Sequence, residues 1–187
     1  MLFKFNKTLS EEDYFAFNVF QSLESEYGKN WIRRRRIFFI TYVVFATALV
    51  VCINGWRTYS IYFTIFTALV TILYMLLLKK MVVRNLKMQM KQLKKTSKLP
   101  FDRASTMEFY EDKFVDITAS TRTEESYNAI ERICIVKDQY VFLYYSSTGA
   151  YVLPIVQIKA QISYEEFVNF LSGKCANVHT FPLNKKA

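Results

Sequence analysis

Residues that could perform chemistry are few and scattered. His179 is the single histidine among the 187 residues, and no Ser/His/Asp or Cys/His grouping surrounds it. The three cysteines, Cys52, Cys134 and Cys175, are an odd number without C-x-x-C spacing, so they predict neither a disulfide framework nor a zinc site. We interpret them as isolated thiols that act as small apolar side chains.

Carboxylate pairs are the remaining candidates for acid–base chemistry. They are adjacent in sequence at Glu11-Glu12, Glu124-Glu125 and Glu165-Glu166. The first and last pairs fall in the first turns of predicted helices, where the helix dipole favours negative charge. Phosphate-loop, dinucleotide, zinc-protease and nucleophile-elbow signatures do not occur in the sequence. We expect no enzymatic activity, cofactor, metal ion or small-molecule substrate.

Two long uncharged stretches dominate the first half of the chain. They are Ile37–Trp56 and Tyr59–Leu78, each long enough as a helix to span the ~30 Å core of a bilayer. Only Arg57 and Thr58 separate them, so they predict a tight transmembrane hairpin. A signal peptide cleaved near Ala46-Thr47-Ala48 is the rival, and the 36 residues before the apolar run argue against it.

Positive charge flanks the hairpin on one side. The net charge is +9, and residues 79–98 contain no acidic side chain. By the positive-inside rule we expect an inner-membrane protein with both termini cytoplasmic. The residues expected at the membrane surface are Arg33, Arg34, Arg35, Arg36, Lys79, Lys80, Arg84, Lys87 and Lys91.

The basic segment also has apolar residues at helical spacing. Val82, Leu86, Met90 and Leu93 predict that the second transmembrane helix continues as an amphipathic helix. The charges either set orientation only or recognise anionic lipid, and the sequence leaves both open. The segment lacks interleaved aromatic residues, so we expect no nucleic-acid binding.

Small and hydroxyl side chains form one stripe on each transmembrane helix. Such residues let helix backbones approach, so we expect the two stripes to face each other. A polar transport path is the alternative, and the absence of intramembrane Asp, Glu, Lys or His argues against it. The predicted seam comprises Thr41, Val44, Ala48, Cys52 and Gly55 on the first helix and Ser60, Thr64, Thr67, Ala68 and Thr71 on the second.

The remainder predicts an α+β domain. Alternating segments separated by short turns indicate an antiparallel sheet, with strands at 107–110, 113–118, 122–126, 129–136, 140–145 and 150–155. Ser163 and Glu166 form a capping box for a closing helix that Gly173 ends. A strand at 2–5 and a helix from the Thr8–Glu11 capping box are expected to dock on this sheet. The expected parts are 1–36, 37–56, 59–78, 79–98, 105–173 and a tail, 174–187.

An aromatic cluster follows from the same alternation. Its members are Tyr140, Phe142, Tyr144, Tyr145 and Tyr151, and neighbouring strand residues point to opposite faces. Not all of them can enter one core. We favour the N-terminal helix as their cover over the bilayer or a partner.

The order of these segments resembles the YcxB-like family of small bacterial membrane proteins. The resemblance rests on LSEEDY, the two adjacent apolar helices, FYEDKFVDI, YNAIERICIVKDQYVFLYY, AYVLPI and EEFVNFL, and covers nearly the whole chain. It implies a pleckstrin-homology-like cytoplasmic domain beside a helical hairpin, in a family without an established biochemical function. The family often has a basic residue after the proline of the last strand, whereas Ile155 follows Pro154 here, which puts a basic ligand contact there in doubt.

Three functions are compatible with this sequence. The favoured one is a non-catalytic, membrane-tethered interaction domain that binds the bilayer and a protein partner or a second copy of itself. The alternatives are an anionic-lipid-sensing module, and an accessory subunit of a membrane transporter or envelope enzyme. The fold class alone does not decide among them.

Overall fold

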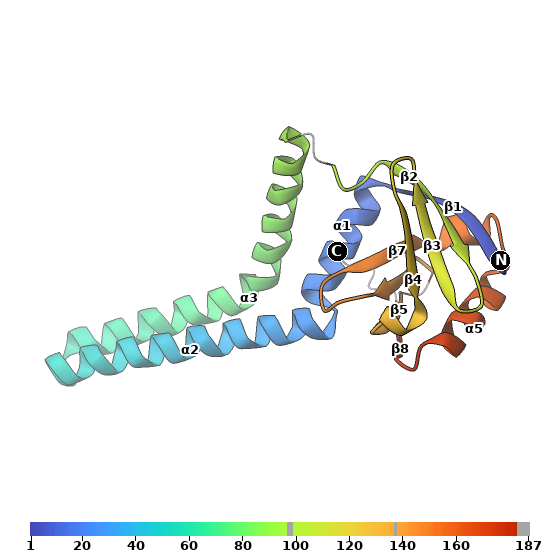
Figure 1. Ribbon diagram of the computed structural model, residues 1–187. Helices are drawn as coiled ribbons and strands as arrows, with labels where there is room; N and C mark the ends of the chain where they lie inside the picture. The colour runs from blue at the N-terminus through green and yellow to red at the C-terminus, as the bar shows by residue number, and fades with distance from the viewer. Residues whose placement is uncertain (97–98, 137, 183–187) are drawn as a thin grey trace. The chain divides into compact units, whose positions relative to one another are not determined.

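The computed structural model describes residues 1–96, 99–136 and 138–182. Contacts divide the chain into two compact units: Met1–Asn18 with Leu93–Ala187, and Val19–Gln92. The first is a two-sheet domain and the second contains a helical hairpin (Figure 1). The hairpin is therefore inserted into the sequence of the domain.

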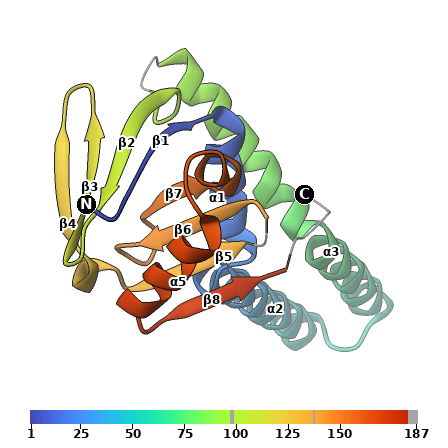
Figure 2. The ribbon, with the colours of Figure 1, turned by 90° about the vertical axis from the view of Figure 1, so that its right-hand side faces the viewer.

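Two long helices, α2 (Glu26–Asn54) and α3 (Thr58–Lys95), form the hairpin, and Figures 1 and 2 show the first part of α3 lying beside α2. α2 begins where the Ser25 hydroxyl accepts a hydrogen bond from the Gly28 N–H. It ends at Gly55, whose φ of 65° suits glycine. Both helices are longer than their apolar stretches, because α2 includes Arg33–Arg36 and α3 continues through the basic segment. Ser97 and Lys98, the end of the predicted segment, lie outside the described residues.

Sheet A consists of β1 (Phe3–Leu9), β2 (Arg103–Phe109), β3 (Lys113–Thr118) and β4 (Arg122–Ser126), antiparallel and in that order. The register places Phe5 opposite Met107 and Met107 opposite Asp116. Alternation therefore gives the sheet an inner face rich in buried aromatic residues and an outer face with polar ones. The expected docking of the N-terminal strand is seen in the β1–β2 pairing.

Sheet B has the order β7-β6-β5-β8. Its antiparallel strands are β5 (Arg132–Val136), β6 (Tyr140–Tyr144) and β7 (Ala150–Pro154), and β8 (Val178–Phe181) runs parallel to β5. A short 3-10 helix, η1 (Tyr127–Ala129), connects the two sheets.

The core lies between the sheets and helix α5 (Tyr164–Lys174). Phe167 of α5 is fully buried, and its ring meets those of Phe3, Phe5 and Phe109 edge-on at centroid distances of 4.9–5.5 Å. These aromatic contacts join the N-terminal strand to the last helix.

Two glutamines bind the free edge of β1. Gln157 lies in the short helix α4 (Ile155–Lys159), and Gln161 lies two residues after that helix ends. The Gln157 amide accepts from the Thr8 N–H and donates to the Thr8 carbonyl, both at 2.9 Å, and Gln161 does the same with Asn6, both at 2.8 Å. Four helical residues rise about 6 Å, close to the roughly 6.7 Å spanned by two strand residues, so the spacings match. The two amides thus stand in for a neighbouring strand.

The structure confirms two long apolar helices followed by an antiparallel-sheet domain with a C-terminal helix. The predicted Thr8–Glu11 capping box is wrong. β1 extends to Leu9 by pairing with β2, so α1 (Glu11–Leu23) is capped by Ser10, whose hydroxyl accepts from the Asp13 N–H at 3.1 Å.

Other boundaries also differ from the sequence-based expectation. The strand expected at 129–136 begins only at Arg132, α5 ends at Lys174 rather than at Gly173, and α4 was not expected. The predicted tail contains β8. Residues 183–187 of that tail lie outside the described part.

Candidate functional site

The chemistry-bearing residues are not brought together. His179 lies exposed on β8, Cys134 is buried in β5, and Cys52 is exposed on α2. Within 1–96, 99–136 and 138–182, no group of three histidine, cysteine or carboxylate side chains could hold a metal ion. Glu124 accepts hydrogen bonds from Lys113 and Arg122. A binding surface is therefore a better candidate than a catalytic centre.

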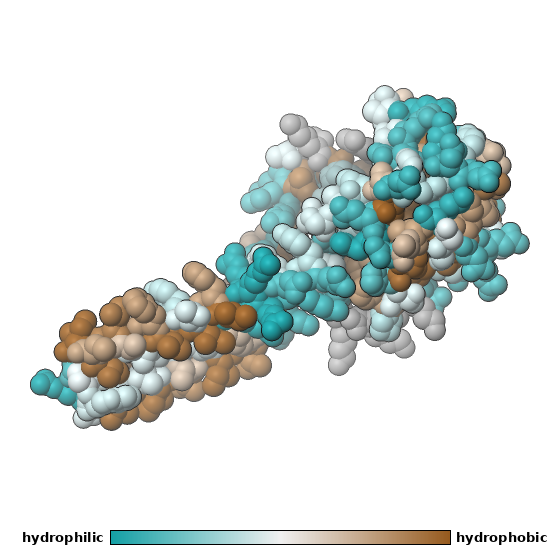
Figure 3. Space-filling view, turned by 60° about the horizontal axis from the view of Figure 1, so that its bottom comes forward, coloured by the Kyte–Doolittle hydropathy of each residue, from teal (hydrophilic) through white to brown (hydrophobic). Residues whose placement is uncertain are grey.

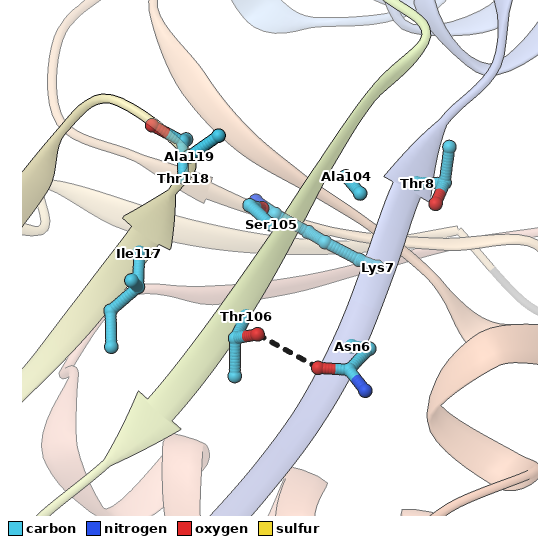
Figure 4. Close-up of a pocket in the computed structure, with 9 residues that line it drawn as sticks. All are labelled: Asn6, Lys7, Thr8, Ala104, Ser105, Thr106, Ile117, Thr118 and Ala119. Carbon is cyan, nitrogen blue, oxygen red and sulfur yellow. Dashed lines mark hydrogen bonds between the residues drawn. The ribbon is translucent and has the colours of Figure 1, made fainter.

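A shallow hollow of about 270 Å³ lies over the first part of β2 in sheet A (Figure 4). Ala104 of β2 lies beside Thr8 of β1, and its small side chain leaves the space open. Thr106 donates a hydrogen bond to Asn6 Oδ1 at 2.8 Å on the same face. The lining is formed by Asn6, Lys7, Thr8, Ala104, Ser105, Thr106, Ile117, Thr118 and Ala119.

Lys7 contributes to the hollow only by its stem. Figure 4 shows its side chain extending behind β2 toward Ser105. The side chain is enclosed, with 8% of the residue exposed, and its Nζ lies 3.6 Å from Asp116 Oδ2 and 5.6 Å from the centre of the Tyr151 ring. Burial lowers the pKa of Lys7, and the Asp116 carboxylate opposes that shift. The charge thus faces the inter-sheet core rather than the hollow.

Paired charges cover the outer face of sheet A beyond the hollow. Lys4 Nζ lies 2.9 Å from Glu108 Oε1, and the Tyr110 hydroxyl donates to Glu108 Oε2 at 2.9 Å. The hydrogen bond from Lys4 and then that from Tyr110 lower the pKa of Glu108. These surface pairs orient side chains and stabilise the domain only slightly.

The aromatic cluster of sheet B is packed on both faces. Phe17 of α1 meets Phe142 at 5.3 Å and Tyr144 at 6.1 Å between ring centres. The Tyr140 hydroxyl donates to Asp13 Oδ1 at 2.9 Å. Burial first, and the Asp13 carboxylate second, raise the pKa of Tyr140. The N-terminal helix is therefore the cover that the sequence favoured, and Tyr145 remains about half exposed.

The predicted membrane-surface residues lie near the ends of the apolar parts of α2 and α3. Arg36 is half-buried, and the others are exposed: Arg33, Arg34, Arg35, Lys79, Lys80, Arg84, Lys87 and Lys91. Arg35 stacks over Trp31 at 4.9 Å. Figure 3 shows the apolar surface of the hairpin bounded by hydrophilic residues.

The seam of the hairpin differs from the predicted one on α2. Thr47 Oγ1 lies 3.5 Å from Thr67 Oγ1, and the Phe39 and Tyr74 rings stack at 4.1 Å. On α3 most of the expected face is used, since Ser60 is buried and Thr64, Thr67 and Thr71 are half-buried, whereas the expected Ala68 is exposed. On α2 the predicted residues are exposed instead: Thr41, Val44, Ala48, Cys52 and Gly55.

Hydroxyl groups on α3 bond mainly within their own helix. Thr64, Thr67 and Thr71 each donate to a carbonyl of the preceding turn, at 2.8–3.0 Å. Ser60 instead reaches across the turn and donates to the Gly55 carbonyl at 2.8 Å. The hydroxyls are thus satisfied internally, as an apolar surrounding requires.

In comparisons with known proteins, no family model, no curated protein and no solved structure matches the chain.

Proposed function

We propose that this is an inner-membrane protein of the YcxB-like type, anchored by the α2–α3 hairpin, whose cytoplasmic two-sheet domain binds a protein partner without catalysis. Support for insertion comes from length and composition, since both helices contain stretches that are long and apolar enough to cross a bilayer. Almost none of the side chains in these stretches are buried, whereas those of a core helix in a soluble protein would be mostly buried. Lipid is the solvent that suits such a surface.

The β1–β2 pairing supports a common side for both flanks of the hairpin. Asp102 N–H donates to the Leu9 carbonyl at 2.7 Å, and Lys94 Nζ lies 2.6 Å from Glu11 Oε2. Residues that precede the hairpin therefore meet the last turn of α3 and the residue before β2 in one domain. This agrees with the charge-based orientation, which places that domain in the cytoplasm.

A pleckstrin-homology-like assignment is part of the proposal. Two packed four-stranded sheets and the terminal helix α5 support it. The parallel strand β8 and the short helix α4 are additions to the layout expected from the sequence.

The outer face of sheet A is the observation on which the binding function depends. Its residues around the hollow, Asn6, Thr8 and Ala104, are exposed, and the hollow's lining contains no His, Cys, Asp or Glu. Hydroxyl, amide and methyl groups of this kind suit contact with a protein surface, whereas acid–base chemistry needs titratable groups.

Site-specific photo-crosslinking in native membranes tests this assignment. A photoreactive amino acid at Ala119, an exposed residue of the lining, is expected to give an adduct of defined mass, and the same group at the exposed Glu165 of α5 is the matched control. The variant Thr8→Arg fills the hollow and should abolish the Ala119 adduct. An adduct of twice the chain mass identifies self-association. Equal labelling from Ala119 and Glu165, or an adduct that survives Thr8→Arg, contradicts the proposal.

A further inference from the structure

The segment that contains the hairpin carries many positive charges and no negative ones. Residues 27–101 contain 14 of the 25 Lys and Arg residues and not a single Asp or Glu. A surface ion-pair network needs both signs, so these cations cannot neutralise one another within the segment. Their counter-charge must come from elsewhere.

Contacts inside the hairpin align one group of these cations. Ser60 with Gly55, Thr67 with Thr47 and Tyr74 with Phe39 fix an antiparallel pairing along the two helices. Continued by one more turn, this pairing brings Arg33–Arg36 of α2 level with Lys79 and Lys80 of α3. Six cations therefore share one level at the base of the hairpin, which we call the basic collar.

Two arginines of the collar are held in place. Arg35 is stacked over Trp31, which reduces its freedom. Arg36 is half-buried, and its Nε is enclosed without a hydrogen-bond partner among the described residues. A guanidinium donor without an acceptor is unfavourable, and an anionic oxygen relieves that cost best.

The collar directly adjoins apolar surface. Ile37 and Phe38 follow Arg36, and Leu76 and Leu77 precede Lys79 by two to three residues; all four are exposed. A ligand that fits both parts has an anionic head and apolar chains. Free phosphate satisfies only the first requirement.

We propose that the basic collar binds the phosphodiester headgroups of anionic phospholipids, so that the protein gathers these lipids at one end of its hairpin. The inference rests on the proposed insertion into a membrane. Guanidinium groups match phosphate oxygens in a two-pronged geometry, and lysines add charge without that constraint. Binding should weaken with salt, as expected for charges at a membrane surface.

Tryptophan quenching by brominated lipids tests the collar with the full chain. The chain has two tryptophans, Trp31 and Trp56, of which Trp56 lies in the turn at the opposite end of the hairpin. One reporter carries Phe38→Trp with Trp31→Phe and Trp56→Phe, and the other keeps Trp56 alone through Trp31→Phe. Both are reconstituted in nanodiscs of phosphatidylcholine and phosphatidylglycerol at four to one, with bromine on either lipid.

At position 38 we expect quenching by brominated phosphatidylglycerol about threefold above its mole fraction, and at Trp56 no enrichment. The change Arg34→Gln with Arg35→Gln, Lys79→Gln and Lys80→Gln should remove the enrichment. A control with equal charge loss further along α3, at Arg84, Lys87, Lys91 and Lys95, should keep it.

Each other outcome has a defined meaning. Quenching in proportion to mole fraction at position 38, or equal loss in both charge variants, overturns the collar as a site. Competition by soluble glycerol phosphate would show that the free anion suffices and would also overturn it. If neither brominated lipid quenches either reporter, the hairpin is not inserted and the proposed function itself fails.

Discussion

Lys7 is a charged side chain enclosed between two sheets, with the Asp116 carboxylate as its ionic partner. Replacing Asp116 by Ala leaves the ammonium without this partner, and we expect a loss of about 1–3 kcal/mol in unfolding free energy. Lys7→Met removes the charge while keeping the apolar stem, and should be neutral or stabilising. Thermal unfolding in detergent, followed by circular dichroism, measures both.

The double variant Lys7→Met with Asp116→Ala serves as the control for this pair. It should recover most of the stability lost in Asp116→Ala, because no unpaired charge remains. If the single and double variants melt at the same temperature, the pair contributes nothing.

Tyr151 makes the stability of the domain depend on alkaline pH. Burial, with Glu125 and Asp116 nearby, raises its pKa to about 12, against 10 for an unperturbed tyrosine. The folded state therefore retains this proton longer than the unfolded state. The stabilising contribution is complete below about pH 10 and is lost progressively as the pH rises toward 12.

Melting temperatures between pH 9 and pH 11.5 measure this effect. They should fall less steeply in Tyr151→Phe than in the unmodified chain. Glu125→Gln removes a carboxylate that raises the pKa of Tyr151, and it should therefore also make the fall less steep. Identical slopes in all three proteins would contradict the assignment.

At the scale of elements, the glutamine pair that closes the β1 edge predicts a specific weakness. Gln157→Ala together with Gln161→Ala removes four hydrogen bonds to β1, and we expect a loss of about 1–3 kcal/mol, because water replaces part of each bond. Gln157→Glu can still accept from Thr8 but cannot donate, so its effect should be intermediate. Hydrogen exchange of the Thr8 amide measures it, with the exposed Gln139→Ala as control.

The hairpin seam predicts a pattern of cross-linking. With Cys52 changed to Ser, Thr47→Cys and Thr67→Cys should form a disulfide on mild oxidation, because these side chains face each other. The pair Ala48→Cys and Ala68→Cys, both exposed, should not. Mass spectrometry of alkylated thiols distinguishes them. Efficient closure of the second pair alone would restore the face predicted from sequence.

The sequence predicted correctly those strands that are defined by neighbouring residues alone. The strands at 113–118 and 122–126 have their predicted bounds, because alternation and short turns define both. β8 was missed because its partner β5 lies more than 40 residues away, and a parallel pairing of that kind leaves no local trace. The α2 face was misjudged because neighbouring Thr47 and Ala48 are equally suitable small residues, and the rotation of the helix is fixed by tertiary contacts such as the Phe39–Tyr74 stack.

The candidate site could be predicted less well than the fold, because it is formed by residues that are far apart in the sequence. Lys7 occupies an inward position in a strand whose sequence favours an exposed lysine, and only the position of Asp116 explains it. The hollow requires Ala104 to lie beside Thr8 across a gap of almost a hundred residues. The cationic residues expected at the membrane surface, by contrast, can be picked out from the sequence alone, because the positive-inside rule uses only the Lys and Arg content near the helix ends.

For the whole molecule, one domain receives both flanks of the hairpin, which predicts a single topology. In a background with Cys52→Ser and Cys175→Ser, Arg57→Cys in the turn should react with a membrane-impermeant maleimide in intact cells. Lys4→Cys, exposed on β1, should react only after the membrane is opened. Labelling of both positions from outside would refute the orientation.

The pairing of β1 with β2 also delays the folding of the domain during synthesis. β1 leaves the ribosome first, but its partner follows only after the hairpin, more than 90 residues later. At 5–20 residues per second, the wait is on the order of 5 to 20 seconds. During that interval the apolar faces of β1 and α1 lack the rest of the two-sheet core, because the hairpin is still being synthesised. Under the proposed function, the membrane anchor is therefore made in full before the binding domain can be completed.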